Sequence, residues 1–386
     1  MTLKIAGLLL FVVVLLIFSR SLTVLKADGK ANFEQDLNAG INDQINELDL
    51  KALEEYVSTL QGEPVKIGER IWEYICGEPI DYGNFLSQLA EVLFERVKSL
   101  LPAFSCIIAI ALLCGLLSSL TDGNSVLPTI RLVAFTASFI PIIVIIGECY
   151  ESARSCVLAM QNQMQILFPL LLTLMAASGG TITVAVCNPS VAFLSTTVVS
   201  IMTSVVLPTC VVTIAFSSAN AVSEELKLHK FTGFFKSFNK WVIGICVSIF
   251  GIFFTLQGIT GAVYDGITRR AAKYAIGTGI PIIGGFLSGG FDLAVAGSVL
   301  IKNSLGTIGI FLLVAVLFEP ISILLSTNLL FRFTSAITAP LGENKISDFL
   351  GETADHLNYC TAAVLFTAFL YFLCVLLMVC STEAFL

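Results

Sequence analysis

Residues 155–223 read SCVLAMQNQMQILFPLLLTLMAASGGTITVAVCNPSVAFLSTTVVSIMTSVVLPTCVVTIAFSSANAVS, and none of these 69 side chains is charged. An ionised side chain at the centre of a bilayer costs at least ~2.5 kcal/mol, so such a run is typical of membrane spans. A spanning helix needs about 20 residues. This run alone therefore predicts two or three crossings, with breaks near Gly179-Gly180, Asn188-Pro189 or Pro208.

Further uncharged runs follow or precede this stretch. They cover residues 99–121, 132–147, 241–264, 274–291, 303–318 and 357–382. Of the 386 residues, 56% are apolar and 13% are charged, whereas a soluble domain carries about 25% charged residues. The composition excludes a soluble enzyme, a disordered chain and a coiled coil. It predicts an all-α polytopic membrane domain over residues 99–386, with six to eight spans.

The first 27 residues have the pattern of an export signal. Lys4 precedes a run without polar side chains from Ile5 to Phe18, and Arg20 follows it. Leu25-Lys26-Ala27 is a poor small-x-small cleavage site, so a cleaved signal and an uncleaved anchor both remain open. In either case the segment that follows is exported.

Residues 28–98 differ sharply from the rest of the chain. Residues 21–100 hold 7 basic and 15 acidic side chains, and apolar residues recur at helical spacing, with Phe85, Leu89, Leu93 and Val97 as one stripe. This pattern predicts a small acidic extracytoplasmic helical domain that leads into the membrane at Pro102. It is either a docking surface for another protein or a solvated cap.

Basic residues suggest an orientation, because Lys and Arg concentrate in cytoplasmic loops. Lys227, Lys230, Lys236 and Lys240 place the loop 221–240 in the cytoplasm. Span one (103–120) then runs inward, span two (131–149) outward, and three short segments between 164 and 220 return the chain inside. If residues 241–261 cross outward, the cations at 269–273 lie outside, so this segment is re-entrant or these cations line a polar site.

The stretch from Gly277 to Gly309 is rich in glycine and contains nine of them. Glycine and proline interruptions in an apolar segment indicate broken helices around a polar pathway, and small residues also allow close helix packing. Both interpretations stay open. For Lys302, an interfacial position with a snorkelling side chain is favoured over an ion pair with Asp292. The candidate pathway or packing residues are Arg269, Arg270, Lys273, Pro281, Gly284, Gly285, Gly289, Asp292, Lys302 and Asn303.

Enzyme signatures are weak. The chain has two histidines and no P-loop, which excludes a His-Glu-x-x-His zinc site and P-loop ATP hydrolysis. Ser298 and Lys302 have the spacing of a dyad, and Tyr264-Asp265 with Asp292 partly resembles an intramembrane aspartyl protease, although Phe291 replaces its second glycine. We expect no catalytic residues, no cofactor and no metal. Nucleic acid is not an expected partner, and most of the eleven cysteines read as small hydrophobic residues.

Several stretches together resemble the stage III sporulation protein AE family, from about residue 40 to the C-terminus. The stretches are Gln257-Gly258-Ile259-Thr260-Gly261, Arg270-Ala271-Ala272-Lys273, Ile280-Pro281-Ile282-Ile283-Gly284-Gly285 and Leu300-Ile301-Lys302-Asn303-Ser304-Leu305-Gly306. The resemblance implies a multi-pass protein of the mother-cell membrane around the forespore. It also implies a channel or secretion-like complex with other stage III A-operon proteins and, indirectly, stage II sporulation protein Q.

Three functions therefore remain in view. The first is an oligomeric membrane subunit of that sporulation complex, needed for late forespore development. The second is a stand-alone secondary transporter of a small solute, for which an inverted repeat would be the sequence signature and none is evident. The third is an intramembrane protease that uses Asp265 and Asp292, or Ser298 and Lys302.

Overall fold

The computed structural model describes residues 41, 43–45, 47–61, 66–69, 71, 85–120, 127–178, 181–222, 228, 230–253, 255, 284–341 and 344–380. Within these ranges the side chains of 60–61, 85–90, 119–120, 181–183, 186–190, 194 and 284–294 are excluded. No β-strand occurs in the described ranges, so the fold is all-α as predicted. The predicted signal sequence at 1–27 lies outside them.

The first long helices form a hairpin. Helix α5 runs from Phe85 to Leu120 without interruption at Pro102, so the amphipathic stripe leads directly into the uncharged run, as its sequence suggested. Helix α6 runs from Leu127 to Ala177 and contains Pro141 and Pro169. Its 51 residues extend roughly 77 Å at 1.5 Å per residue, far more than the ~30 Å of a hydrocarbon core.

Within its described residues, the uncharged 69-residue run breaks once. Helix α6 ends at Ala177, and α7 (Thr181–Ile201), a π-helical turn (Met202–Val206) and α8 (Leu207–Val222) then form one continuous helical run. Pro208 has no N–H to donate to the preceding turn, and the adjoining π-helical turn accommodates it. Three short segments between 164 and 220 were therefore a wrong expectation.

The remaining helices complete the bundle. An unlabelled helix covers Lys230–Phe253, α10 covers Gly284–Thr338 with Pro320 inside it, a 3-10 turn covers Ala339–Leu341, and α11 covers Asn344–Cys380. Residues 284–309 belong to uninterrupted helix. The prediction of broken helices is thus wrong for this part of the glycine-rich stretch, since helical hydrogen bonding continues through each glycine. Pro281 lies outside the described residues.

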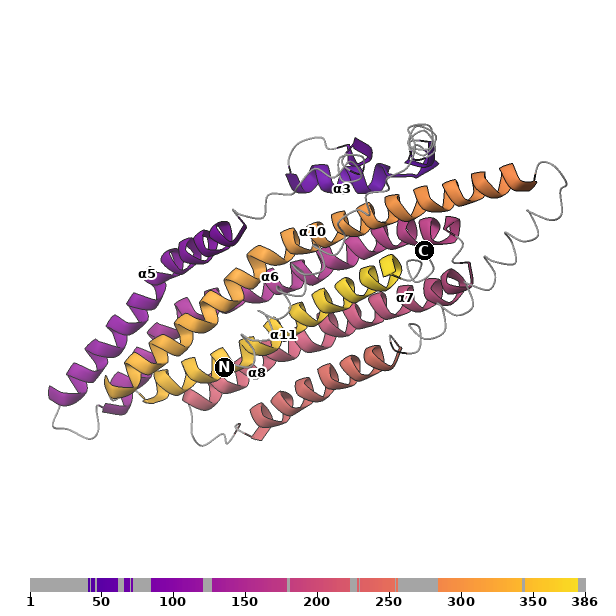
Figure 1. Cartoon of the computed structure of the whole chain (residues 1–386). Helices are drawn as coiled ribbons and strands as arrows, with labels where there is room; N and C mark the ends of the chain where they lie inside the picture. Colours follow the sequence, from indigo (N-terminus) through magenta and orange to yellow (C-terminus); the bar gives the residue numbers. More distant parts are fainter. Residues whose placement is uncertain are drawn as a thin grey trace.

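The long helices lie roughly parallel along one elongated bundle (Figure 1). The helix ends that flank the α5–α6, α8–Lys230 and α10–α11 connections gather at one end of it, and those that flank the α6–α7 connection lie at the other. The connection between the expected spans 103–120 and 131–149 was expected on the same side of the membrane as the loop 221–240. The start of α6 at Leu127 and the end of α8 at Val222 lie at the same end of the bundle.

Six helices in the described ranges are long and apolar enough to cross a membrane. They are Glu91–Ser118, Leu127–Ala177, Val191–Val222, Lys230–Phe253, Val295–Leu341 and Asn344–Cys380. Helix α11 is the most buried of them and packs against α6, α8 and α10. The fold is that of a polytopic helical membrane protein with α11 near its centre.

Part of the acidic N-terminal segment packs on this bundle. Helix α3 (Lys51–Gln61) buries Leu53 and Val57 together with Ile41, Ile67 and Ile71 in a shared core. The apolar side of α3 therefore faces inward. Figure 1 shows α3 alongside α10 and α6.

Candidate functional site

A cluster of charged side chains joins three helices near the α10–α11 connection. The Asp355 carboxylate of α11 accepts hydrogen bonds from Lys236 Nζ at 3.0 Å and from Arg332 Nη2 at 2.7 Å. Lys236 belongs to the Lys230–Phe253 helix and Arg332 to α10. We call these three residues the ion junction. Their side chains are 41–45% exposed, so solvent or headgroups reach the pair of contacts.

Further hydrogen bonds surround the ion junction. Arg332 Nε donates to Asn328 Oδ1 at 3.1 Å, and Asn328 Nδ2 donates to the Ala354 carbonyl. Ser217 of α8 donates to the Glu352 carboxylate. Four helices are therefore held at this level by polar contacts, which limits sliding of α8 and the Lys230–Phe253 helix against α10 and α11.

The sequence places the ion junction at the ends of apolar segments. Asp355 and His356 precede the uncharged run 357–382, Lys236 precedes the run 241–264, and Arg332 follows the uncharged residues 320–331. Charged residues at such boundaries reach water or lipid headgroups without crossing the hydrocarbon. The three helices bring these boundaries to one level of the bundle.

A second site lies further along α10, where two glycines meet neighbouring helices. A Cβ at Gly306 would overlap Val379 of α11, and one at Gly309 would overlap Leu167 of α6. The buried Tyr371 hydroxyl of α11 donates to the Gly309 carbonyl at 3.0 Å. We call Gly306, Gly309 and Tyr371 the glycine seam. Close packing of small residues is thus one role of the glycine-rich stretch.

Helix α6 continues these contacts along α10. Gln163 Nε2 donates to the Leu312 carbonyl at 3.1 Å, and Cys156 Sγ donates to the Val316 carbonyl at 3.7 Å. Successive turns of α10 therefore accept hydrogen bonds from side chains of α11 and α6. These contacts fix the rotation of α10 between its two neighbours.

The N-terminal segment touches the bundle beside this seam. Ser298 of α10 donates to Gln44 Oε1 at 3.2 Å, and Gln44 and Ile41 cover Gly297. Tyr56 of α3 lies beside Gln163. Burial raises the pKa of the Tyr56 phenol above its ordinary value, and the neighbouring Gln163 side chain offsets part of that rise. Neither the Tyr56 hydroxyl nor Gln163 Oε1 has a hydrogen-bond partner among the described residues.

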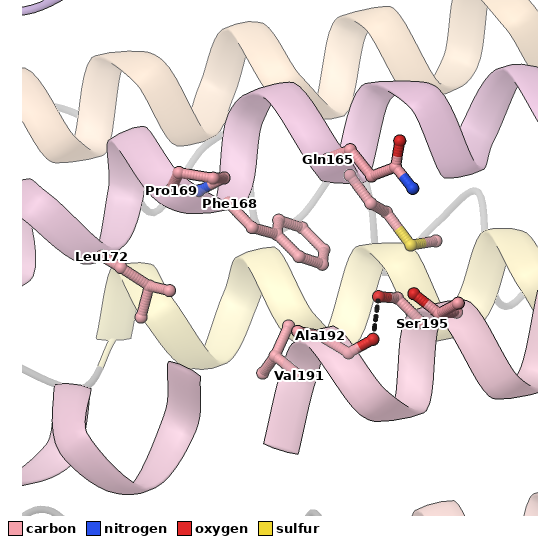
Figure 2. Close-up of a pocket in the computed structure, with 9 residues that line it drawn as sticks. Gln165, Phe168, Pro169, Leu172, Val191, Ala192 and Ser195 are labelled. Carbon is pink, nitrogen blue, oxygen red and sulfur yellow. Dashed lines mark hydrogen bonds between the residues drawn. The ribbon is translucent and has the colours of Figure 1, made fainter. Parts of the chain in front are cut away.

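Figure 2 shows a shallow cavity between α6 and α7. Its volume is about 180 Å³, below the ~300–1,000 Å³ of typical small-molecule sites. The Phe168 ring points toward Ala192 and Ser195, and the Ser195 hydroxyl donates to the Ala192 carbonyl. The lining is mostly apolar, without a charged group, so the cavity resembles a packing gap more than a solute site.

The described residues contain no group of three or more His, Cys, Asp or Glu side chains that could hold a metal ion. The nine described cysteines are free thiols. Seven of the nine are buried, as small hydrophobic residues are.

The chain is similar in sequence to known proteins of one family. A family model for stage III sporulation protein AE matches residues 69–382. The chain belongs to the stage III sporulation protein AE family. It is also 25% identical over 308 residues to the stage III sporulation protein AE of Bacillus subtilis (strain 168), covering 78% of this chain and 77% of the relative. No solved structure matches it.

The candidate residues chosen from sequence fall into three groups in this family member. Arg269, Arg270, Lys273 and Pro281 lie outside the described residues. Gly284, Gly285, Gly289 and Asp292 belong to the first turns of α10, where only the helical backbone is described. Lys302 and Asn303 are described with their side chains, and a role of either in a polar pathway stays a prediction.

Lys302 differs from its expected position. Its side chain is fully buried, at 0% exposure, so the snorkelling interpretation is wrong. Ser298, one turn earlier on the same face of α10, is also buried. The surrounding helices and the N-terminal segment cover this part of α10, which explains why a lysine near an apolar boundary is enclosed.

Sequence reasoning missed the ion junction and most of the glycine seam. Gly306 and Gly309 were counted among the nine glycines but not singled out, and Asp355 was not considered. Two signals were available: Asp355 directly precedes the uncharged run 357–382, and Gln163 is a polar residue inside an uncharged run. Neither signal identifies its partners, because Lys236 is 119 residues from Asp355, Arg332 is 23 residues from it, and Leu312 is 149 residues from Gln163.

Proposed function

We propose that this protein is a membrane subunit of a sporulation-specific channel or secretion-like complex that links the mother cell and the forespore. Membership of the stage III sporulation protein AE family is the observation that carries this proposal. The protein would act in the mother-cell membrane around the forespore and support late forespore development. Its proposed partners are other stage III A-operon proteins and, indirectly, stage II sporulation protein Q.

The bundle supports a scaffold role within such a complex. Helix α10 is joined to α6 and α11 by the glycine seam and by the Gln163 and Cys156 contacts, and to the Lys230–Phe253 helix through the ion junction. A bundle fixed at two levels keeps its outer surfaces at constant positions relative to one another. This property suits a subunit that positions neighbouring proteins.

The same geometry weighs against a stand-alone transporter. A carrier needs a solute site between parts that move against each other. The cavity between α6 and α7 is small and mostly apolar. Helix α10 is hydrogen-bonded to its two neighbours, α6 and α11. We therefore also propose a non-catalytic, structural role.

Purification from sporulating cells tests the proposal. The tagged full-length chain is extracted into native nanodiscs from its own spore-forming host, its mass is measured, and co-purifying proteins are identified. We expect a large assembly that contains other stage III A-operon proteins. A lone monomer or dimer, in cells with normal late forespore gene expression, would overturn the proposal and favour a transporter.

Deletion of the gene provides the matching functional measurement. A reporter of late forespore gene expression should fall in the deletion strain and recover when the wild-type chain is restored. Normal reporter activity without the gene contradicts a role in forespore development even if an assembly is isolated.

A further inference from the structure

Two exposed apolar surfaces lie on opposite flanks of the bundle. The first, belt A, belongs to α5 and α6 and contains Leu113, Leu116, Val133, Ile140 and Val144, each at least half exposed. The second, belt B, belongs to the Lys230–Phe253 helix and contains Trp241, Ile249 and Ile252, exposed by 55–69%. In Figure 1 the α10, α6 and α11 helices separate the Lys230–Phe253 helix from α3 and α5.

Contacts with α11 show how far apart the two belts lie along the bundle. Phe139, next to Ile140 of belt A, packs against Phe349 with ring centroids 5.9 Å apart. Phe250, next to Ile249 of belt B, packs against Phe366 at 6.5 Å. The helical stretch from Phe349 to Phe366 corresponds to roughly 26 Å at 1.5 Å per residue. The belts are therefore displaced by most of a bilayer core.

At the level of belt A, the opposite flank is charged. The ion junction lies there, and its Asp355 is less than two turns from Phe349 on α11. Lys230 and Lys240 of the same helix as Lys236 are also exposed. A bilayer perpendicular to the bundle at this level would place these charges in hydrocarbon, which ionised groups avoid.

At the level of belt B, the opposite flank is charged as well. Helix α3 lies beside Gln163 of α6, just over one turn from Phe168, whose ring packs on Tyr371 at 5.8 Å. Its outer side exposes Lys51 and Glu55. A perpendicular bilayer at this level would immerse these side chains instead.

The order of residues along individual helices shows where lipid contact ends. On α6, the apolar belt at 132–144 is followed by exposed Glu148, Glu151 and Arg154 and then by the α3 contact. On the Lys230–Phe253 helix, three lysines and exposed Phe234 precede Trp241 and the apolar surface. Aromatic and basic residues of this kind mark a membrane–water interface.

We propose that the bundle lies obliquely in the bilayer, so that belts A and B contact the acyl chains at the same depth on opposite flanks. The acidic N-terminal segment and the charges of α5 and α6 then lie on one aqueous side, and the ion junction lies on the other with its lysines. The contacts of Phe139 with Phe349 and of Phe250 with Phe366 place α11 between α6 and the Lys230–Phe253 helix. A displacement of roughly 26 Å across these three layers, each about 8–10 Å thick, gives a tilt near 45°, steeper than the ~20° average. Helices of 51 and 55 residues are long enough for this arrangement.

Depth-dependent fluorescence quenching tests the proposal. Trp72 and Trp241 are replaced by Phe in the full-length chain, and Ile140→Trp or Ile249→Trp is introduced. Each variant is placed in nanodiscs of phosphatidylcholine brominated at defined acyl positions. We expect both tryptophans to lose most of their emission, with the same bromine position most effective for each. Glu55→Trp and Asp348→Trp, at the same two levels on exposed charged positions, should keep their emission.

Quenching of only one of the Ile140 and Ile249 sites would overturn the proposal, because a perpendicular bilayer covers one belt alone. The other belt would then be a protein contact. Quenching of Glu55→Trp would overturn it as well. A second measurement guards against a folding defect: Ile140→Cys and Ile249→Cys should both resist a membrane-impermeant maleimide that labels Glu55→Cys. Labelling of either isoleucine site contradicts the oblique arrangement.

Discussion

The glycine seam and the ion junction both hold α10 and α11 together, but by opposite means. At the seam, the absence of side chains on Gly306 and Gly309 lets α11 and α6 approach α10 closely, and the contacts are buried. At the ion junction, three long side chains reach one another while remaining 41–45% exposed. Packing therefore fixes α10 where the bundle is enclosed, and charge fixes it where the bundle is open to water or headgroups.

The largest effect should follow from adding a side chain to the seam. In Gly306→Leu, the new side chain would overlap Val379, a stiff β-branched residue that is 1% exposed. Overpacking of a core typically costs about 1–3 kcal/mol, and a leucine exceeds what this contact can absorb. We expect loss of monodisperse protein after mild heating in nanodiscs.

The matched control is Gly251→Leu on the Lys230–Phe253 helix. A Cβ there meets nothing within 4 Å, so the same substitution in an apolar helix should leave thermal stability near that of the wild type. Equal losses in the two variants would mean that leucine itself, and not the close approach at Gly306, disturbs the protein.

The glycine seam also shows which features of the fold could be predicted from the sequence and which could not. The all-α polytopic fold could be predicted from uncharged runs such as 155–223. The absence of charged side chains is read directly from the sequence and does not depend on which residues pack together. Whether the nine glycines break a helix or let a neighbouring helix approach closely could not be predicted. That outcome depends on whether Val379 of α11 and Leu167 of α6, both distant in sequence, arrive beside Gly306 and Gly309.

The charged residues were predictable only in part, for a similar reason. Lys236 was counted in an expected basic loop at 221–240, but it lies in the Lys230–Phe253 helix, and its partner Asp355 is 119 residues away. Lys302 was assigned to an interface from its place beside an uncharged run, and it is buried because α10 continues past it as part of a covered helix. Sequence spacing gives the boundary of an apolar segment and does not give the neighbours of that boundary.

A smaller effect is expected at the ion junction. Asp355→Asn removes the charge that Lys236 and Arg332 share, and half-exposed ion pairs contribute up to ~1 kcal/mol each. We expect a loss of about 1 kcal/mol in unfolding free energy, which shrinks in 1 M salt because salt screens exposed pairs. Chemical denaturation in nanodiscs at low and high salt measures both values.

Asp348→Asn serves as the control for that variant. Asp348 is exposed on α11, and the described residues include no ion pair to it. Its replacement should change stability little at either salt concentration. A salt-independent loss in Asp355→Asn would show that Asp355 acts through buried hydrogen bonding, and the contrast between a packed seam and a charged junction would disappear.

The smallest effect, and the one whose sign is most informative, is expected for Gln163→Leu. This change removes the hydrogen bond from Nε2 to the Leu312 carbonyl, worth about 1 kcal/mol. It also removes Oε1, a buried acceptor without a partner among the described residues, and leaving such an atom unpaired costs a similar amount. The Leu312 carbonyl belongs to α10 and keeps its helical role, so the two contributions nearly cancel. We therefore expect almost no change in unfolding free energy, measured by the same denaturation assay.

A clear loss, larger than that of Asp355→Asn, would mean that Oε1 pairs with the Tyr56 hydroxyl in the membrane, because that hydroxyl would then lose its acceptor. Tyr56→Phe would in that case show a matching loss, and α3 would be held to the bundle by polar contact at the seam as well as by its apolar side.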